Sequence, residues 1–186
     1  MSGLAAGGSP RPKCHNVDYR RKGMAVRKGW AGPKIQRAER ATLGIMRCMP
    51  SEPVVTLVRS EQLTTRAPYA YAAVAGPFVF TAGACPLDAD GSTVAVGDFA
   101  GQANQVMANL ETALQAAGVQ LTDVVKTTVF VASSQRKDLS TVWDVVRAAF
   151  GDHDAPSTLL GVAVLGYDDQ LVEVEAVAVR PAEIPA

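Results

Sequence analysis

The chain has 186 residues, 48% hydrophobic and 19% charged, which is typical of one packed globular domain with an appendage. The three cysteines, Cys14, Cys48 and Cys85, are odd in number and widely spaced, which excludes a disulfide framework. With only two histidines besides, the sequence shows no metal-ligand pattern. Because no apolar run approaches the ~20 residues needed to cross a bilayer, we expect a soluble protein with no membrane span. The cysteine usage suits a reducing cytoplasm.

The formal net charge of zero is the sum of a basic N-terminal segment, residues 1–50, called the head below, and an acidic remainder, residues 51–186, called the body. Residues 1–50 hold 11 Lys and Arg against 2 Asp and Glu, whereas residues 51–186 hold 7 against 16. Residues 1–50 show breakers and charge clusters without a sustained period, so we expect a disordered basic extension followed by one domain, 51–186. Three alternatives remain for the head: upstream sequence before a start at Met46 or Met49, a basic arm for nucleic acid or anionic lipid, or a transit peptide.

The acidic body begins with strand signals. Residues 54–59 form a short β-rich run, and residues 69–75 and 77–82 predict a hairpin that turns at Gly76-Pro77. Pro77 would begin its strand, where a missing N–H is tolerated.

Two helices and a central strand follow. Residues 99–117 carry apolar side chains at helical spacing, with Asp98 as N-cap and Gly118 as the stop. Residues 124–132 are β-branched and predict a central strand. Residues 139–150 predict a second helix, which Gly151 ends.

The chain ends with two apolar runs, 158–165 and 171–179, joined by a Gly/Asp-rich turn at 166–169. The element order β-β-β-α-β-α-β-β, with hairpins at both ends, predicts an α+β fold with one mixed sheet and two helices on one face. The other face would then be covered by further copies of the chain, which predicts a homo-oligomer, cyclic by default.

The last strand alternates, and one of its faces carries Glu173 and Glu175 between apolar residues. Two carboxylates on one face raise each other's pKa, which suits general acid/base chemistry; a solvated face or a subunit salt bridge is the alternative. No phosphate-binding glycine loop and no nucleophile elbow occurs in the sequence. Cys85 has no basic neighbour in sequence and is interpreted as a buried structural thiol.

Several of these residues fall into motifs that resemble the RidA (YjgF) family of reactive intermediate deaminases. The motifs, which span roughly residues 54–180 in family order, are Pro68-Tyr69, Phe80-Thr-Ala-Gly83 with Pro86-Leu-Asp, Gln105-x-x-x-Asn109-Leu, Asp123-Val-Val-Lys-Thr-Thr-Val-Phe130 and Leu171-Val-Glu-Val-Glu-Ala-Val-Ala-Val179. The resemblance implies a chorismate-mutase-like fold, a homotrimer with small-molecule pockets between subunits, and cofactor-free hydrolysis of enamines and imines to carbonyl compounds and ammonia.

The resemblance also implies site residues. Tyr69 matches a tyrosine that reaches the pocket, Ala82-Gly83 matches a Ser-Gly step whose backbone faces the ligand, and Glu173 matches the carboxylate that holds the attacking water. Active members carry an arginine immediately before a Ser/Thr at the head of the fifth strand. Here that region reads Ala155-Pro156-Ser157-Thr158, so the arginine position falls on Pro156 or Ser157, with Thr158 beside it.

The missing arginine bears on the substrate. Its planar fork would hold a substrate carboxylate through two charge-assisted hydrogen bonds, and such bonds contribute about 1.5–3 kcal/mol. We therefore expect an imine or enamine hydrolase whose substrate is neutral or cationic, or a related small-molecule hydrolase, with Glu173 as the catalytic carboxylate. The alternative is a non-catalytic ligand-binding or regulatory trimer. RNA binding, attributed to some relatives, is disfavoured by the acidic body.

Overall fold

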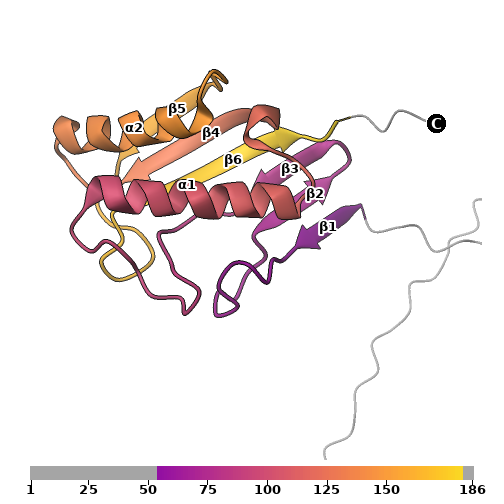
Figure 1. The fold of residues 1–186 in the computed structure, drawn as a ribbon, viewed down its shortest axis with the longest axis horizontal. Coiled ribbons are helices and arrows are strands. Elements are labelled where there is room, and N and C mark those ends of the chain that lie inside the picture. Colours follow the sequence, from indigo (N-terminus) through magenta and orange to yellow (C-terminus); the bar gives the residue numbers. More distant parts are fainter. Residues whose placement is uncertain (1–53, 182–186) are drawn as a thin grey trace, which may run out of the picture. The chain divides into compact units, whose positions relative to one another are not determined.

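The computed structural model describes residues 54–181, which form a six-stranded sheet and two helices (Figure 1). In chain order the elements are β1 (Val55–Val58), β2 (Ala72–Ala75), β3 (Phe78–Thr81), α1 (Phe99–Ala116), the 3-10 turn η1 (Leu121–Asp123), β4 (Val124–Val131), α2 (Arg136–Phe150), β5 (Ser157–Gly161) and β6 (Val172–Val179). The predicted order of strands and helices is confirmed. The predictions for residues 1–50 lie outside the described residues.

Local signals explain both helices. The Asp98 side chain accepts a hydrogen bond from the Ala100 N–H at 3.0 Å, and Gly118 follows α1 with φ of +78°, a conformation that favours glycine. Helix α2 begins at Arg136, three residues before the predicted start. Its first turn is polar, so the apolar pattern could not reveal it. Gly151, with φ of +59°, ends α2 as predicted.

Strand pairing follows the order β1-β2-β3-β6-β4-β5. The predicted hairpin of β2 and β3 is confirmed, with Gly76 at φ of +57° in its turn. The hairpin predicted for the last two strands is wrong. Strand β4 lies between them, parallel to β5 and antiparallel to β6. The connection through α2 makes β4 and β5 parallel neighbours, and β6 then fills the gap between β3 and β4.

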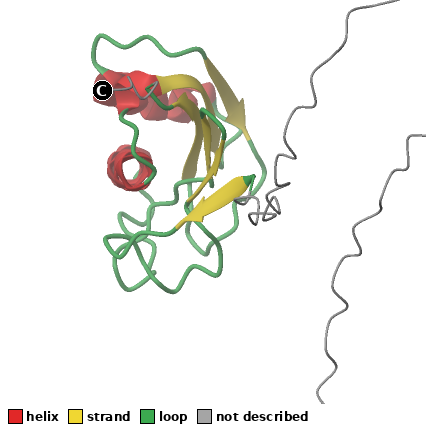
Figure 2. Cartoon of the chain, turned by 90° about the vertical axis from the view of Figure 1, so that its right-hand side faces the viewer, coloured by secondary structure: helices red, strands yellow, loops and turns green. Residues whose placement is uncertain are grey.

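Both helices cover the same face of the sheet, and no described helix covers the other (Figure 2). The strand β6 alternates as predicted: its even-numbered residues are buried beneath the helices, while Glu173, Glu175, Val177 and Val179 are partly or fully exposed on the other face. The core between helices and sheet includes Val79, Val106, Leu110, Leu114, Val129, Val131, Val142, Val146, Val172 and Val174, each at most 1% exposed.

The uncovered face of the sheet, called the open face below, is rich in apolar side chains. Leu57, Phe78, Phe80 and Leu160 are 68%, 46%, 47% and 42% exposed, and their register places them on the same side as Glu173. Large exposed apolar patches are common where folded proteins meet a partner. Neither described helix, α1 or α2, is long and apolar enough to span a bilayer.

Candidate functional site

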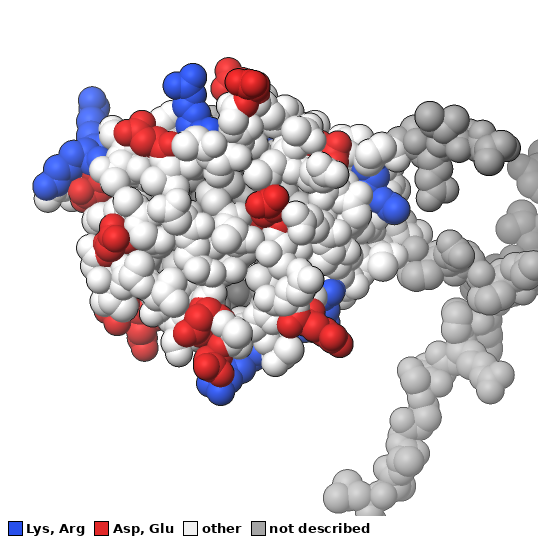
Figure 3. All heavy atoms as spheres, viewed as in Figure 1, with Lys and Arg blue, Asp and Glu red and all other residues white. Residues whose placement is uncertain are grey.

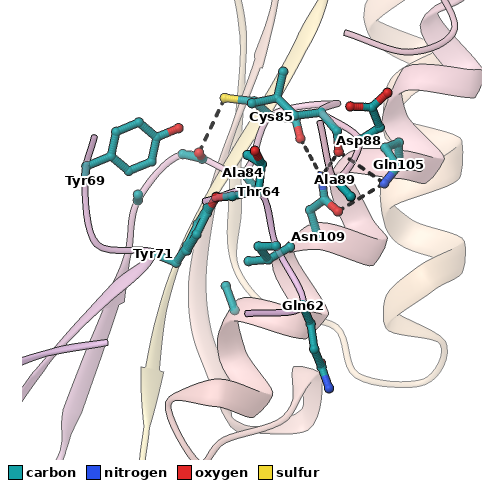
Figure 4. Close-up of a pocket in the computed structure, with 15 residues that line it drawn as sticks. Gln62, Thr64, Tyr69, Tyr71, Ala84, Cys85, Asp88, Ala89, Gln105 and Asn109 are labelled. Carbon is teal, nitrogen blue, oxygen red and sulfur yellow. Dashed lines mark hydrogen bonds between the residues drawn. The ribbon is translucent and has the colours of Figure 1, made fainter. Parts of the chain in front are cut away.

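A cavity of about 100 Å³ lies where the segment before β2 and the loop after β3 meet α1 (Figure 4). Three groups of residues line it. They are Gln62, Leu63, Thr64, Tyr69 and Tyr71 from the first segment, Ala82, Gly83, Ala84, Cys85, Leu87, Asp88 and Ala89 from the loop, and Gln105, Asn109 and Ala113 from α1. Three of the predicted site residues, Tyr69, Ala82 and Gly83, are therefore together at one cavity.

Ala82 and Gly83 sit in an irregularity between β3 and β6. Phe80 pairs with Val177 and Ala84 with Val174, so three residues of one strand face two of the other. The Thr81 hydroxyl accepts from the Ala176 N–H at 2.9 Å and replaces a ladder hydrogen bond. An extra residue of this kind bends a strand and is common beside active sites.

Glu173 packs directly against this irregularity. A Cβ atom at Gly83 would lie 2.0 Å from Glu173 Oε1, so only glycine leaves room for the carboxylate. Glu173 is half-buried and does not itself line the cavity; it touches the cavity wall at Gly83 and Cys85. The structure thus brings the predicted carboxylate and the predicted glycine step into contact.

The other oxygen of Glu173 is held by two donors. Its Oε2 accepts from Gln170 Nε2 at 3.0 Å and from Cys85 Sγ at 3.6 Å. The site therefore holds an anchored carboxylate beside a glycine, which suits it to hold a water or accept a proton.

Tyr69 supplies a neutral hydroxyl to the site. Its Oη lies 3.0 Å from Tyr167 Oη, and its ring meets Tyr71 edge-on, with centroids 5.9 Å apart. Burial, and then the hydrogen bond with Tyr167, raises the pKa of Tyr69 well above its usual range. Tyr71 donates to the Thr64 carbonyl, and burial raises the pKa of this phenol too. Both phenols stay protonated at neutral pH. The Tyr71 proton is already bonded to the Thr64 carbonyl, so Tyr69 is the phenol that can donate to a ligand.

Cys85 is a structural thiol, as predicted. It is 8% exposed, and burial, followed by the nearby charge of Glu173, raises the pKa of the thiol to about 12. A thiol that stays protonated at neutral pH is a poor nucleophile. Its one proton has two acceptors within reach, the Gly83 carbonyl at 3.5 Å and Glu173 Oε2 at 3.6 Å.

Two amide side chains of α1 fix the loop that carries these groups. Asn109 Nδ2 donates to the Cys85 carbonyl at 2.8 Å and to the Leu87 carbonyl at 2.9 Å, and its Oδ1 accepts from Gln105 Nε2 at 3.0 Å. These are the two polar residues of the Gln105-x-x-x-Asn109 motif. Their spacing of four places both on the same face of the helix.

The predicted residues Pro156, Ser157 and Thr158 lie elsewhere. Ser157 pairs with Thr127 on β4, whereas Glu173 lies opposite Phe130, three residues further along that strand. At about 3.3 Å per residue, and with β4 between β5 and β6, Ser157 is more than ~10 Å from Glu173. Within one chain, the head of β5 does not join the cavity.

The ammonium group of Lys126, a residue of β4, lies beside the head of β5. Lys126 Nζ donates to Thr158 Oγ1 at 2.6 Å and to the Thr127 carbonyl at 2.8 Å, and the Ser157 hydroxyl bonds to that of Thr127. An ammonium already bonded to two oxygens is a compact point charge, not the planar fork that grips a carboxylate in two bonds.

Sequence reasoning missed three contributors to the site. Tyr167 and Gln170 lie in the β5–β6 loop, whose glycine and aspartates predict a turn but not which side chains point inward. The donor role of Cys85 depends on a contact 88 residues away along the chain. Glu175, by contrast, is exposed and lies opposite Thr128, away from the cavity lining.

Comparisons with known proteins agree with this architecture. The family model described as Endoribonuclease L-PSP matches residues 59–180. A 2-iminobutanoate/2-iminopropanoate deaminase of Salmonella typhimurium is 37% identical over 116 residues, which are 61% of this chain and 88% of that protein. A RutC family protein of Pyrococcus horikoshii is 34% identical over 113 residues, 61% of this chain and 87% of that protein.

Solved structures show the same fold. The crystal structure of the YjgF gene product from E. coli superposes with a TM-score of 0.59 at 33% identity, covering 68% of this chain and 99% of that one. Yeast Mmf1 superposes with a TM-score of 0.62 at 28% identity, over 68% and 99% of the two chains. The matched part of this chain contains the cavity and β6.

Proposed function

The chain belongs to the endoribonuclease L-PSP family, also known as the RidA or YjgF family, and we propose that it hydrolyses reactive imines and enamines to carbonyl compounds and ammonia. Relatives at about 35% identity are named as 2-iminobutanoate/2-iminopropanoate deaminases. The observation that carries the proposal is the Glu173 carboxylate, which packs on Gly83 at the wall of the cavity that Tyr69 lines.

The residues of the site supply what this reaction needs. A water held by Glu173 gives a proton to the carboxylate, and its oxygen forms a bond to the imine carbon. The C=N electron pair moves to nitrogen, which takes up the proton from Glu173. The proton of the new hydroxyl group then passes through Glu173 to the same nitrogen, so that the C–N bond breaks with its electron pair on nitrogen and ammonia leaves as the C=O bond forms. Tyr69 donates a hydrogen bond to the substrate, and Glu173 carries protons between water and nitrogen.

The head of β5 limits the substrates. The crystal structure of TdcF from E. coli, which is 29% identical to this chain, contains bound serine, a molecule with a carboxylate. This chain has Pro156, Ser157 and Thr158 where active members of the family carry an arginine before a Ser/Thr. We therefore propose imines without a carboxylate as substrates, because the paired hydrogen bonds to a carboxylate would be lost.

The open face supports assembly into a homotrimer of chorismate-mutase-like fold, with the site completed between subunits. Phe78 and Phe80 expose nearly half of their surface there, and an apolar sheet face of this kind is normally covered. In such a trimer the head of β5 of one copy would meet the Glu173 site of its neighbour. This arrangement accounts for the distance between Ser157 and Glu173 within one chain.

Glu173→Gln tests the proposal. The amide keeps the shape but takes up no proton, so ammonia release from a carboxylate-free imine should fall by at least about a hundredfold, while the trimer and the melting temperature stay nearly unchanged. The control is Glu175→Gln on the same strand, which should retain activity. Loss of assembly in Glu173→Gln would instead make this carboxylate an interface residue.

A ligand-binding or regulatory trimer is the second candidate, and the missing arginine is the observation that favours it. The same comparison separates the two: such a protein would bind imines or carbonyl compounds in the cavity but release no ammonia above the uncatalysed rate.

RNA binding finds little support in the folded part of the chain. Residues 51–186 hold 7 Lys and Arg against 16 Asp and Glu. The face shown in Figure 3 carries acidic side chains across its surface and basic ones near its rim. Phosphate contacts need clustered Lys and Arg. We propose that residues 51–186 form the family domain, that residues 1–50 are an added basic segment, and that the protein is cytoplasmic. Deleting residues 1–50 should then remove any RNA affinity. Unchanged affinity would contradict the assignment of RNA contacts to the basic segment.

A further inference from the structure

The β5–β6 loop contributes a buried glutamine, Gln170, which is 5% exposed and lies against Glu173. A buried amide is costly unless each of its polar atoms has a partner. Gln170 satisfies all of its groups, and one of its partners is the carboxylate on which the proposed function depends.

Three hydrogen bonds fix the orientation of the Gln170 amide. Its Oε1 accepts from the Tyr167 N–H at 3.0 Å, and its Nε2 donates to the Val172 carbonyl at 3.2 Å and to Glu173 Oε2 at 3.0 Å. A flipped amide would set its oxygen against two acceptors and its NH₂ against a donor. The orientation therefore follows from the partners, and the NH₂ group points at Glu173.

The loop that carries Gln170 is itself held on two sides. Gln102 of α1, fully buried, donates from Nε2 to the Asp169 carbonyl at 2.8 Å and accepts from the Leu171 N–H at 2.7 Å. Tyr167 at the other end of the loop bonds to Tyr69 through the two hydroxyls. The backbone on both sides of Gln170 is thus fixed, and its side chain can hold Glu173 in place.

The two oxygens of Glu173 differ as a result. Oε2 receives two donors, from Gln170 and Cys85, whereas no donor within residues 54–181 contacts Oε1. Oε1 is also the oxygen that lies over Gly83, which lines the cavity. One oxygen is anchored, and the other is free to bind a small molecule.

We infer that Gln170 is a positioning residue that anchors Glu173 Oε2 and so assigns Oε1 as the oxygen that holds the attacking water and takes its proton. This inference rests on the proposed function. In the hydrolytic step, the O–H bond of the water breaks, its proton passes to Oε1, and the water oxygen bonds to the imine carbon. The hydrogen bond from Gln170 to Oε2 keeps the carboxylate from turning during this transfer.

Gln170→Met is the direct test, because methionine has similar length and volume but donates no hydrogen bond. With a carboxylate-free imine as substrate, we expect kcat to fall about tenfold to hundredfold, the effect of losing one hydrogen bond to a charged group, while KM stays within about twofold. The matched control is Gln115→Met. Gln115 donates to Glu111 at 3.2 Å on the exposed side of α1, so its replacement breaks a Gln–Glu pair away from the site and should leave kcat unchanged.

A crystal structure of Gln170→Met gives a readout that does not depend on turnover. The expected result is that the Glu173 carboxylate leaves its place over Gly83 or adopts several orientations. An unmoved carboxylate, or an unchanged kcat in a folded variant, would overturn the inference. If the wild-type protein releases no ammonia from any imine, the proposed function fails, and the position of Glu173 in the variant still decides whether Gln170 anchors it.

Discussion

At the residue scale, the site depends on one glycine and one carboxylate, because the Glu173 carboxylate fills the space that a side chain at Gly83 would need. Gly83→Ala would place a methyl group 2.0 Å from Glu173 Oε1, so either the carboxylate or the loop must move. We expect a loss of activity of at least tenfold and a destabilisation of about 1–3 kcal/mol, as for other overpacked sites. Gly166→Ala, with nothing within 4 Å of the added methyl group, is the control. Activity equal to wild type in Gly83→Ala would show that Glu173 is not held where the structure places it.

Cys85 gives a pH-dependent prediction at the same scale. Its pKa is raised from 9.0 to about 12 by burial, so the folded state favours the protonated thiol more than the unfolded state does. The resulting stability is complete below about pH 9 and is lost as the pH rises toward 12. Unfolding measurements between pH 8 and 11 should show a steeper loss for wild type than for Cys85→Ala. Parallel curves would contradict the assigned shift.

At the element scale, α1 organises the loops around the site through buried amides. Gln102→Leu keeps the volume but leaves the Leu171 N–H and the Asp169 carbonyl without a protein partner, in a loop where Asp169 has a φ of +57°. We expect a destabilisation of about 1–3 kcal/mol, seen as a lower melting temperature. Gln115→Leu, on the exposed side of the same helix, should have almost no effect. Equal stability of the two variants would refute the buried anchor.

The elements themselves were largely predictable because their signals are local. Asp98, Gly118 and the apolar spacing of residues 99–117 defined α1, and the alternation in β6 correctly placed Glu173 and Glu175 on one face of the strand. The pairing of β5 with β6 was predicted wrongly, because the neighbour of a strand depends on contacts far away in sequence. For the same reason, a turn signal could not reveal that Gln170 reaches Glu173.

At the scale of the whole molecule, the open face connects the fold to the proposed trimer. Phe80→Asp places a charge in the middle of this face, where Phe80 lies between Ala73 and Val177. We expect light scattering after size exclusion to give a monomer for this variant and a trimer for wild type. Ala108→Asp, on the exposed side of α1, should remain a trimer. A wild-type monomer, or an assembled Phe80→Asp, would rule out the open face as the interface.

The measurement that tests the central claim most directly is ammonia release by the wild-type protein from two substrates, 2-aminoacrylate generated enzymatically and an imine without a carboxylate. The site has Glu173 for water and no arginine at the head of β5, so we predict that kcat/KM for the neutral imine exceeds that for 2-aminoacrylate by about tenfold to hundredfold. A preference for 2-aminoacrylate would mean that another group, such as Lys126, binds the carboxylate. No release from either substrate would contradict the assignment as an imine hydrolase.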